Sequence, residues 1–136
     1  MRPLDARTLV AGQIAPADVA ALAAGGVTMI VNNRPDGEEP GQPPGAEIEA
    51  AARSAGIGYR DIPVAGSIAP FQIEAMAQAL EAADGKLLAF CRSGTRSAYL
   101  WALARSRQGG DGDSIVASAA AAGYDLTPIR GLLGRD

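Results

Sequence analysis

The sequence predicts an α/β fold with a mainly parallel central sheet flanked by helices. Short apolar runs alternate along the chain with alanine-rich segments that have helical spacing. The segment 86–90 is almost wholly apolar, as expected of a central strand that is covered on both faces. No internal repeat or long linker interrupts this alternation, so we expect a single domain over residues 1–136.

In the first half of the chain, proline and glycine mark where the predicted elements begin and end. The predicted elements are a strand over 8–12, a helix over 16–24, a strand over 28–32 and a helix over 46–55. Pro16 suits a helix start, and the pair Gly25-Gly26 suits its end. Residues 35–45 are too rich in proline and glycine to form a regular element.

The second half continues the alternation. The predicted elements are strands over 58–64 and 86–90, and helices over 70–83, 97–107, 113–123 and from 127 onward. Asp84-Gly85 closes the first of these helices, and Gly109-Gly110 suits the end of the second, because glycine adopts the left-handed conformations found there. We expect Asp113 to cap the next helix.

The composition argues against several classes of function. The net charge is −3, from 12 basic and 15 acidic residues, and no basic stripe predicts nucleic-acid binding. No apolar stretch has the length of a membrane span or a secretory signal, so we expect a cytoplasmic protein that does not associate with membranes. The chain has one cysteine and no histidine, which argues against a disulfide and a zinc or iron site. We expect no cofactor and no metal.

Cys91, the single cysteine, follows a predicted strand and precedes a helix. Binding crevices of parallel α/β sheets lie at the carboxyl ends of strands. The N–H groups of a tight loop entering a helix favour anions, as do the flanking arginines Arg92 and Arg96. Such surroundings favour the reactive thiolate, so Cys91 is predicted to be a nucleophile. The alternative is an inert, buried cysteine.

The segment 91–97 resembles two known kinds of anion-binding loop. Protein tyrosine and dual-specificity phosphatases use a Cys-x5-Arg loop after a histidine, whereas this chain has Cys-x4-Arg, and Phe90 precedes the cysteine. The shorter loop strongly resembles that of rhodanese-type sulfurtransferases. A smaller ring of amides fits a persulfide sulfur better than a phosphoryl group.

Longer motifs resemble one family over roughly residues 9–133. These motifs are 31–43, 91–97 and 122–126. They are similar to the beta-lactamase-hydrolase-like, phosphatase-like domains, often called sulfurtransferases. The resemblance implies a dual-specificity-phosphatase fold carrying a rhodanese-like loop. It also implies a role in sulfide and persulfide metabolism, with a sulfide-oxidising enzyme as a possible partner.

The expected site residues come from this loop and from the start of the long proline-rich loop. Catalytic roles are expected for Cys91 and Arg96, and anion-binding roles for Arg92, Ser93, Gly94, Thr95 and Ser97. It is equally compatible with the sequence that Arg92 points outward and places a positive charge at the entrance of the site. The serine and threonine hydroxyls are also compatible with a purely structural role in holding the loop. Arg34 and Asp36 are candidates for the pocket lip, while a solvated turn is the alternative for Asp36, Glu38 and Glu39.

A general acid is missing where a phosphatase of this fold would carry one. Residues 64–69, after the predicted strand 58–64, contain no carboxylate, and Asp61 is more consistent with a structural role. Transfer of sulfane sulfur needs no strong acid, because sulfite and thiolates leave readily. This absence therefore agrees with the short loop.

The sequence-based hypothesis is a rhodanese-like sulfurtransferase that forms a persulfide on Cys91. A small anionic donor such as thiosulfate would supply the sulfur. An external thiol or cyanide must accept it, because the chain has no second cysteine. The alternatives are a cysteine-dependent phosphatase and a non-catalytic sensor of anions or persulfides. The sequence identifies neither the physiological donor and acceptor nor the oligomeric state.

Overall fold

Strand β5 (Lys86–Phe90) is the middle strand of a five-stranded sheet with the order β1-β2-β5-β3-β4. The other strands are β1 (Arg2–Pro3), β2 (Thr8–Ala11), β3 (Val27–Asn32) and β4 (Gly58–Asp61). Strands β2 to β5 pair in parallel, whereas β1 lies antiparallel on the edge. This computed structural model describes residues 1–134, so the last two residues of the predicted domain lie outside it.

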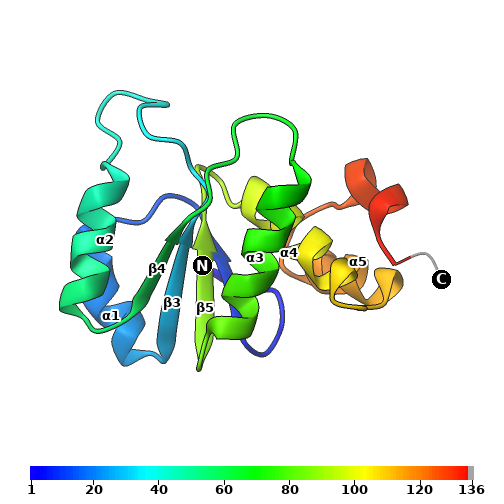
Figure 1. Ribbon diagram of the computed structural model, residues 1–136, viewed down its shortest axis with the longest axis horizontal. Coiled ribbons are helices and arrows are strands. Elements are labelled where there is room, and N and C mark those ends of the chain that lie inside the picture. The colour runs from blue at the N-terminus through cyan, green and yellow to red at the C-terminus, as the bar shows by residue number, and fades with distance from the viewer. Residues whose placement is uncertain (135–136) are drawn as a thin grey trace.

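Helices cover both faces of the sheet. They are η1 (Pro16–Asp18), α1 (Val19–Ala24), α2 (Gly45–Ser54), α3 (Pro70–Ala82), α4 (Thr95–Arg107), α5 (Gly112–Ala121) and η2 (Thr127–Leu132). Figure 1 shows α1 and α2 on one side of the sheet and α3, α4 and α5 on the other. The predicted α/β fold, with a mainly parallel sheet between helices, is confirmed.

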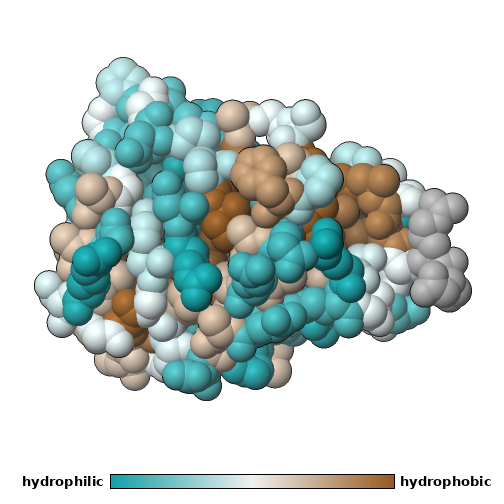
Figure 2. Space-filling model, in the orientation of Figure 1, coloured by the Kyte–Doolittle hydropathy of each residue, from teal (hydrophilic) through white to brown (hydrophobic). Residues whose placement is uncertain are grey.

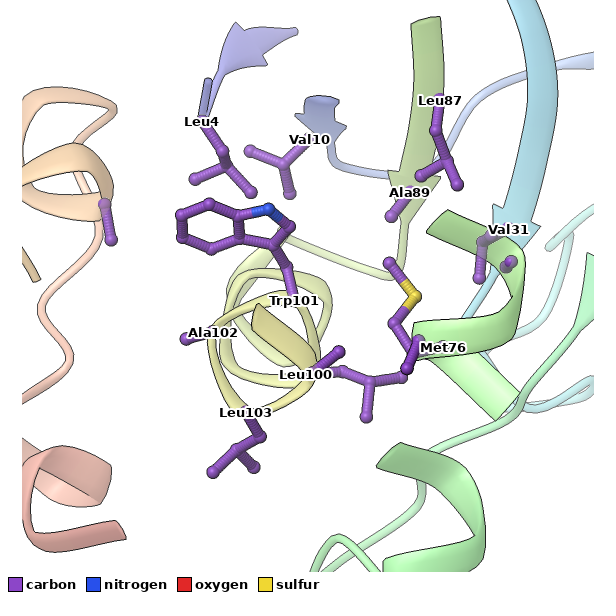
Figure 3. Close-up of a cluster of buried hydrophobic side chains, with 14 of the residues drawn as sticks. Leu4, Val10, Val31, Met76, Leu87, Ala89, Leu100, Trp101, Ala102 and Leu103 are labelled. Atoms are coloured by element: carbon purple, nitrogen blue, oxygen red, sulfur yellow. The ribbon is translucent and has the colours of Figure 1, made fainter. Parts of the chain in front are cut away.

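Alternate residues of the central strand enter two different cores. Leu87 and Ala89 pack against the side of α3 and α4, whereas Leu88 and Phe90 pack against the side of α1 and α2. All four are buried, which explains the continuous apolar run. In the first core, Figure 3 shows the Trp101 ring of α4 beside Leu4 and Val10.

The observed elements differ from the sequence-based prediction at several boundaries and by one additional strand. Strand β4 ends at Asp61 rather than residue 64, and Pro63 lacks the N–H that a continued ladder needs. Helix α4 begins at Thr95, two residues before the prediction, because Gly94 at its N-cap has a φ of 95° and turns the chain directly into the helix. The short strand β1 was not predicted, since two exposed residues carry no periodic pattern.

The predicted cap at Asp113 is wrong. Asp111 is the N-cap of α5, and its carboxylate accepts a 2.9 Å hydrogen bond from the backbone N–H of Ser114. Asp113 lies in the first turn and forms an ion pair with Arg130 of η2 instead. In the part of the chain that the structure describes, every helix falls short of the length and apolar character needed to cross a bilayer.

Candidate active site

Cys91 lies where β5 ends, in the loop that enters α4. The backbone N–H of Gly94 donates a 3.1 Å hydrogen bond to Cys91 Sγ. The positive end of the α4 dipole adds to this donor, so the loop is suited to bind an anion. The predicted position at the carboxyl end of a central strand is confirmed. Cys91 is fully buried here, so a substrate reaches the sulfur only after neighbouring groups move.

Neighbouring strand ends hold this loop, which we call the cradle (residues 91–97). The Cys91 N–H donates to the Ala11 carbonyl at the end of β2, at 3.4 Å. Ser97 is fully buried and donates its hydroxyl to Asn33 Oδ1 at 2.8 Å, and Asn33 in turn donates to the Ile62 carbonyl at 2.9 Å. The Ser97 hydroxyl therefore holds the loop. The Ser97 backbone N–H is the group left to make the predicted contact with an anion.

Arg96 stands beside Cys91, and both of its Nη atoms donate hydrogen bonds. Its Nη1 donates to Glu38 Oε2 and to the Val64 carbonyl, both at 2.7 Å, and its Nη2 donates to Glu38 Oε1 at 2.9 Å. The hydrogen bonds to Glu38, and then the charge of the Cys91 thiolate, raise the pKa of Arg96 against the effect of burial. Arg96 is thus a permanent cation that binds a carboxylate in the two-pronged manner it would use for a substrate anion.

Glu38 and Glu39 join three arginines at the mouth of the cradle. Arg34 is buried and pairs with Glu38 at 2.9 Å and with Glu39 at 2.6 Å. Arg92 points outward, 65% exposed, and its Nε lies 3.1 Å from Glu39. Hydrogen bonds from Arg96 and Arg34 lower the pKa of Glu38 to about 2. Glu38 is therefore a carboxylate at every physiological pH.

This network revises the sequence-based view of residues 34–39. Arg34 is buried rather than forming an exposed lip. Glu38 and Glu39 lie in an exposed bend, as the solvated-turn alternative predicts, and both also form ion pairs with Arg34. Asp36 accepts a 2.8 Å hydrogen bond from the Gly45 N–H at the start of α2, so its role is to fix the loop. The only sequence signal for the network is the i, i+4 spacing of Arg34 and Glu38.

Comparison with known proteins identifies the family. The model of the phosphatase-like domain of beta-lactamase hydrolase-like proteins matches residues 1–110. The chain belongs to this family of phosphatase-like domains. A beta-lactamase hydrolase-like protein of Agrobacterium fabrum is 41% identical over 107 residues, which are 78% of this chain and 25% of the relative. This phosphatase-like domain thus spans about a quarter of the length of that relative.

Solved structures agree with this assignment. A candidate phosphatase from Neisseria meningitidis superposes with a TM-score of 0.82 and 35% identity, covering 96% of this chain and 93% of that one. Human DUSP28 superposes with a TM-score of 0.61 and 20% identity, covering 90% and 83%, and supports the fold alone. The predicted resemblance to dual-specificity phosphatases is confirmed at the level of the fold.

The phosphatase-like domain carries no carboxylate in the loop that follows β4. Residues 64–69 lead from β4 to α3, and the Val64 carbonyl contacts Arg96. Asp61 is the last residue of β4, and partial burial, followed by the negative charges of Asp36 and Glu49, raises the pKa of its carboxyl. Asp61 lies within β4 and not in the loop, so residues 64–69 themselves offer Cys91 no acid.

An apolar cavity of about 670 Å³ lies against Arg96. Its walls include Ile68 from the loop before α3, Leu103 from α4 and Ile129 from η2. Figure 2 shows a hydrophobic hollow continuing into a hydrophobic surface toward the C-terminal part of the molecule. The cavity places room for an apolar group directly beside the cation of the cradle.

Tyr124 is the site residue that sequence reasoning missed. It comes from the segment after α5, and its hydroxyl donates to the Ser93 carbonyl at 3.2 Å. Within the cradle, Ser93 Oγ also donates to Thr95 Oγ1 at 3.2 Å, so these two predicted anion-binding side chains contact each other. The sequence showed Tyr124 only as part of the family motif at 122–126, without a role.

Proposed function

We propose that this phosphatase-like domain is a cysteine-dependent phosphatase that acts on organic phosphate esters with a good leaving group. The observation that carries the proposal is the hydrogen bond from the Gly94 N–H to Cys91 Sγ at the start of α4, with Arg96 beside it. The likeness to the Neisseria meningitidis candidate phosphatase supports the same chemistry. This likeness favours phosphoryl transfer over the sulfur transfer that the loop length and the missing acid predict from the sequence.

Two displacement steps at phosphorus account for such a reaction. In the first, the Cys91 thiolate attacks, an S–P bond forms, and the ester P–O bond breaks with its electron pair leaving on the alcohol oxygen. In the second, water attacks phosphorus, the S–P bond breaks with its electron pair returning to sulfur, and phosphate leaves with the protons of the water while the thiolate is regenerated. Backbone N–H groups of the cradle and the Arg96 guanidinium stabilise the charge on the other oxygens.

The surroundings of the cradle define the class of ester. Because residues 64–69 offer no carboxylate, the leaving oxygen receives no strong acid assistance. Phenols leave readily without such help, whereas simple alcohols do not. The apolar cavity beside Arg96 also suits an aromatic group better than a sugar or a peptide. We therefore infer aryl phosphates, or esters of similar leaving ability, as the substrate class.

Sulfur transfer is the second candidate, and the Cys-x4-Arg spacing favours it. The Cys91 thiolate would attack the outer sulfur of thiosulfate, forming one S–S bond while the other breaks and sulfite leaves with the electron pair. An external thiolate would then take the sulfur from the Cys91 persulfide. The same missing acid is compatible with this reaction, because neither sulfite nor a thiolate needs protonation to leave.

Turnover assays separate these candidates. We expect the purified protein to hydrolyse an aryl phosphate, and Cys91→Ser to abolish this activity. Arg96→Lys should lower kcat by about 10²- to 10³-fold, the effect of losing one well-placed donor, because lysine cannot bind two oxygens at once. Arg53→Lys is the matched control, since Arg53 pairs with Glu49 on the exposed side of α2.

The assays also have a clear contrary outcome. Sulfur transfer from thiosulfate to cyanide, dependent on Cys91 and without aryl phosphate hydrolysis, would replace the phosphatase with the sulfurtransferase. Anion binding without turnover of either substrate would favour the sensor.

A further inference from the structure

The end of α5 fixes where Tyr124 lies. Gly123 has a φ of 94°, and the Tyr124 N–H donates to the Ala119 carbonyl at 2.9 Å, which is the long hydrogen bond of a Schellman helix end. Arg2 of β1 donates to the Ala122 carbonyl at 3.3 Å and ties the same turn to the edge of the sheet. The turn that carries Tyr124 is therefore held at two points, and the Tyr124 ring packs partly buried against the core.

The Tyr124 hydroxyl contacts the same peptide unit that contacts the nucleophile. It donates to the Ser93 carbonyl at 3.2 Å, while the Gly94 N–H donates to Cys91 Sγ at 3.1 Å. The carbonyl and the N–H belong to one peptide group, and in a trans peptide they point in opposite directions. A carbonyl that accepts a hydrogen bond makes its own N–H a stronger donor. Tyr124 thus acts on Cys91 through one peptide.

The contact between Tyr124 and the 93–94 peptide requires that residue 94 has no side chain. A Cβ at position 94 would overlap the Tyr124 hydroxyl oxygen and lie 3.0 Å from its Cζ atom. Gly94 also has a φ of 95°, which side chains rarely adopt. The tight approach therefore depends on a glycine at the residue whose N–H binds the sulfur.

We propose that Tyr124 is a positioning residue that orients and polarises the 93–94 peptide, and so stabilises the thiolate of Cys91. The proposal rests on the proposed function only in taking Cys91 as the nucleophile, and it holds for either phosphoryl or sulfur transfer. It predicts that the Tyr124 hydroxyl changes the pKa of the Cys91 thiol without donating a hydrogen bond to the sulfur itself.

Among the residues that the structure describes, few charged groups surround Cys91 and Tyr124. Cys91 faces Arg96 of α4 and Tyr124, and Arg96 is itself paired with Glu38 of the long loop. Tyr124 faces Cys91 and Arg2 of β1, and burial, followed by the charge of Cys91, raises the pKa of its phenol. Tyr124 therefore remains a neutral donor over the range in which a thiol titrates.

The test is the pH dependence of Cys91 alkylation by iodoacetamide, measured on the folded protein by intact mass. Because Cys91 is buried, access to the sulfur scales the alkylation rate, whereas the midpoint of the pH profile follows the thiolate. The measurement needs no turnover, so its result is independent of which substrate the enzyme uses. Tyr124→Phe should shift the midpoint of the profile upward by about half a pH unit, through the lost polarisation of one hydrogen bond. Tyr99→Phe, on the partly buried side of α4, is the matched control and should leave the midpoint unchanged.

A second variant keeps the packing intact. Placing 3-fluorotyrosine at position 124 strengthens the phenol as a donor without removing it, and should move the midpoint to lower pH. Opposite shifts for the two variants support the relay, because a purely structural role for the ring would not give them. A midpoint within error of wild type for both folded variants would overturn the proposal.

Discussion

Glu38 is the residue on which access to the cradle depends. Its carboxylate accepts hydrogen bonds from both Nη atoms of Arg96, so it occupies the donors that an anionic substrate needs. Because its pKa is held at about 2, the competition persists across the working pH range and is not relieved by mild acid. In the proposed phosphatase reaction, substrate binding would therefore include the exchange of the Glu38 carboxylate for another anion at Arg96.

We expect Glu38→Gln to bind inorganic phosphate more tightly than wild type. The variant removes one negative charge that competes for Arg96, and a partly exposed pair of this kind is worth about 1 kcal/mol or less, which allows a gain of up to about fivefold. Titration calorimetry at several pH values between 5 and 8 should show the same gain throughout. Glu49→Gln makes the same charge change at an exposed pair with Arg53 and should have no effect. Weaker phosphate binding by Glu38→Gln would instead show that Glu38 orients Arg96.

Local sequence patterns predict residues of the cradle but not the residues that reach it from elsewhere. Cys91 and Arg96 lie within one short loop, so their spacing alone indicates an anion site. Glu38 meets Arg96 across 58 residues, and Tyr124 meets Ser93 across 31. Such contacts depend on how strands and helices pack, which a periodic pattern does not specify.

At the level of single elements, α4 is bounded by two glycines with nearly the same backbone conformation. Gly94 precedes the helix with a φ of 95°, and Gly109 follows it with a φ of 94°. Their surroundings differ, because an added Cβ at Gly109 meets nothing within 4 Å, whereas at Gly94 it meets Tyr124. Comparing substitutions at the two glycines therefore distinguishes the free energy lost to a left-handed backbone from the free energy lost to a steric clash in the cradle.

Gly94→Ala is expected to destabilise the protein more than Gly109→Ala. In each variant, alanine in the left-handed conformation lowers the free energy of unfolding by about 1–2 kcal/mol. Only Gly94→Ala adds the steric overlap with Tyr124. Chemical denaturation of the two variants, and of Gly94→Ala combined with Tyr124→Ala, measures the difference. The double variant should recover part of the loss. Equal costs for the two glycines would contradict the close contact between Tyr124 and the cradle.

The elements themselves were largely predictable, and the exceptions have physical causes. Strand β5 was predicted with its observed bounds, because a continuous apolar run between two glycine-containing segments has few other interpretations. The cap of α5 was assigned to Asp113 instead of Asp111, since both aspartates precede the same apolar run and only the fold shows which carboxylate faces Ser114.

At the scale of the whole molecule, the order of the strands creates the site. Strand β5 enters the sheet between β2 and β3, so the loops that leave these three strands meet at one edge. The alternating pattern predicts a parallel sheet with Cys91 at that edge, but it does not predict which strands become neighbours. The phosphatase-like domain thus obtains Gln13, Arg34 and the cradle on adjacent strand ends, and Arg34 donates to Gln13 Oε1 at 3.0 Å.

The central claim is that Cys91 becomes covalently phosphorylated, and intact mass spectrometry after a rapid quench tests it most directly. With an aryl phosphate, we expect one phosphoryl group on the wild-type protein, located at Cys91 by fragmentation, and none on Cys91→Ser. Absence of this adduct, together with the gain of a single sulfur atom at Cys91 from thiosulfate, would contradict the phosphatase and identify a sulfurtransferase.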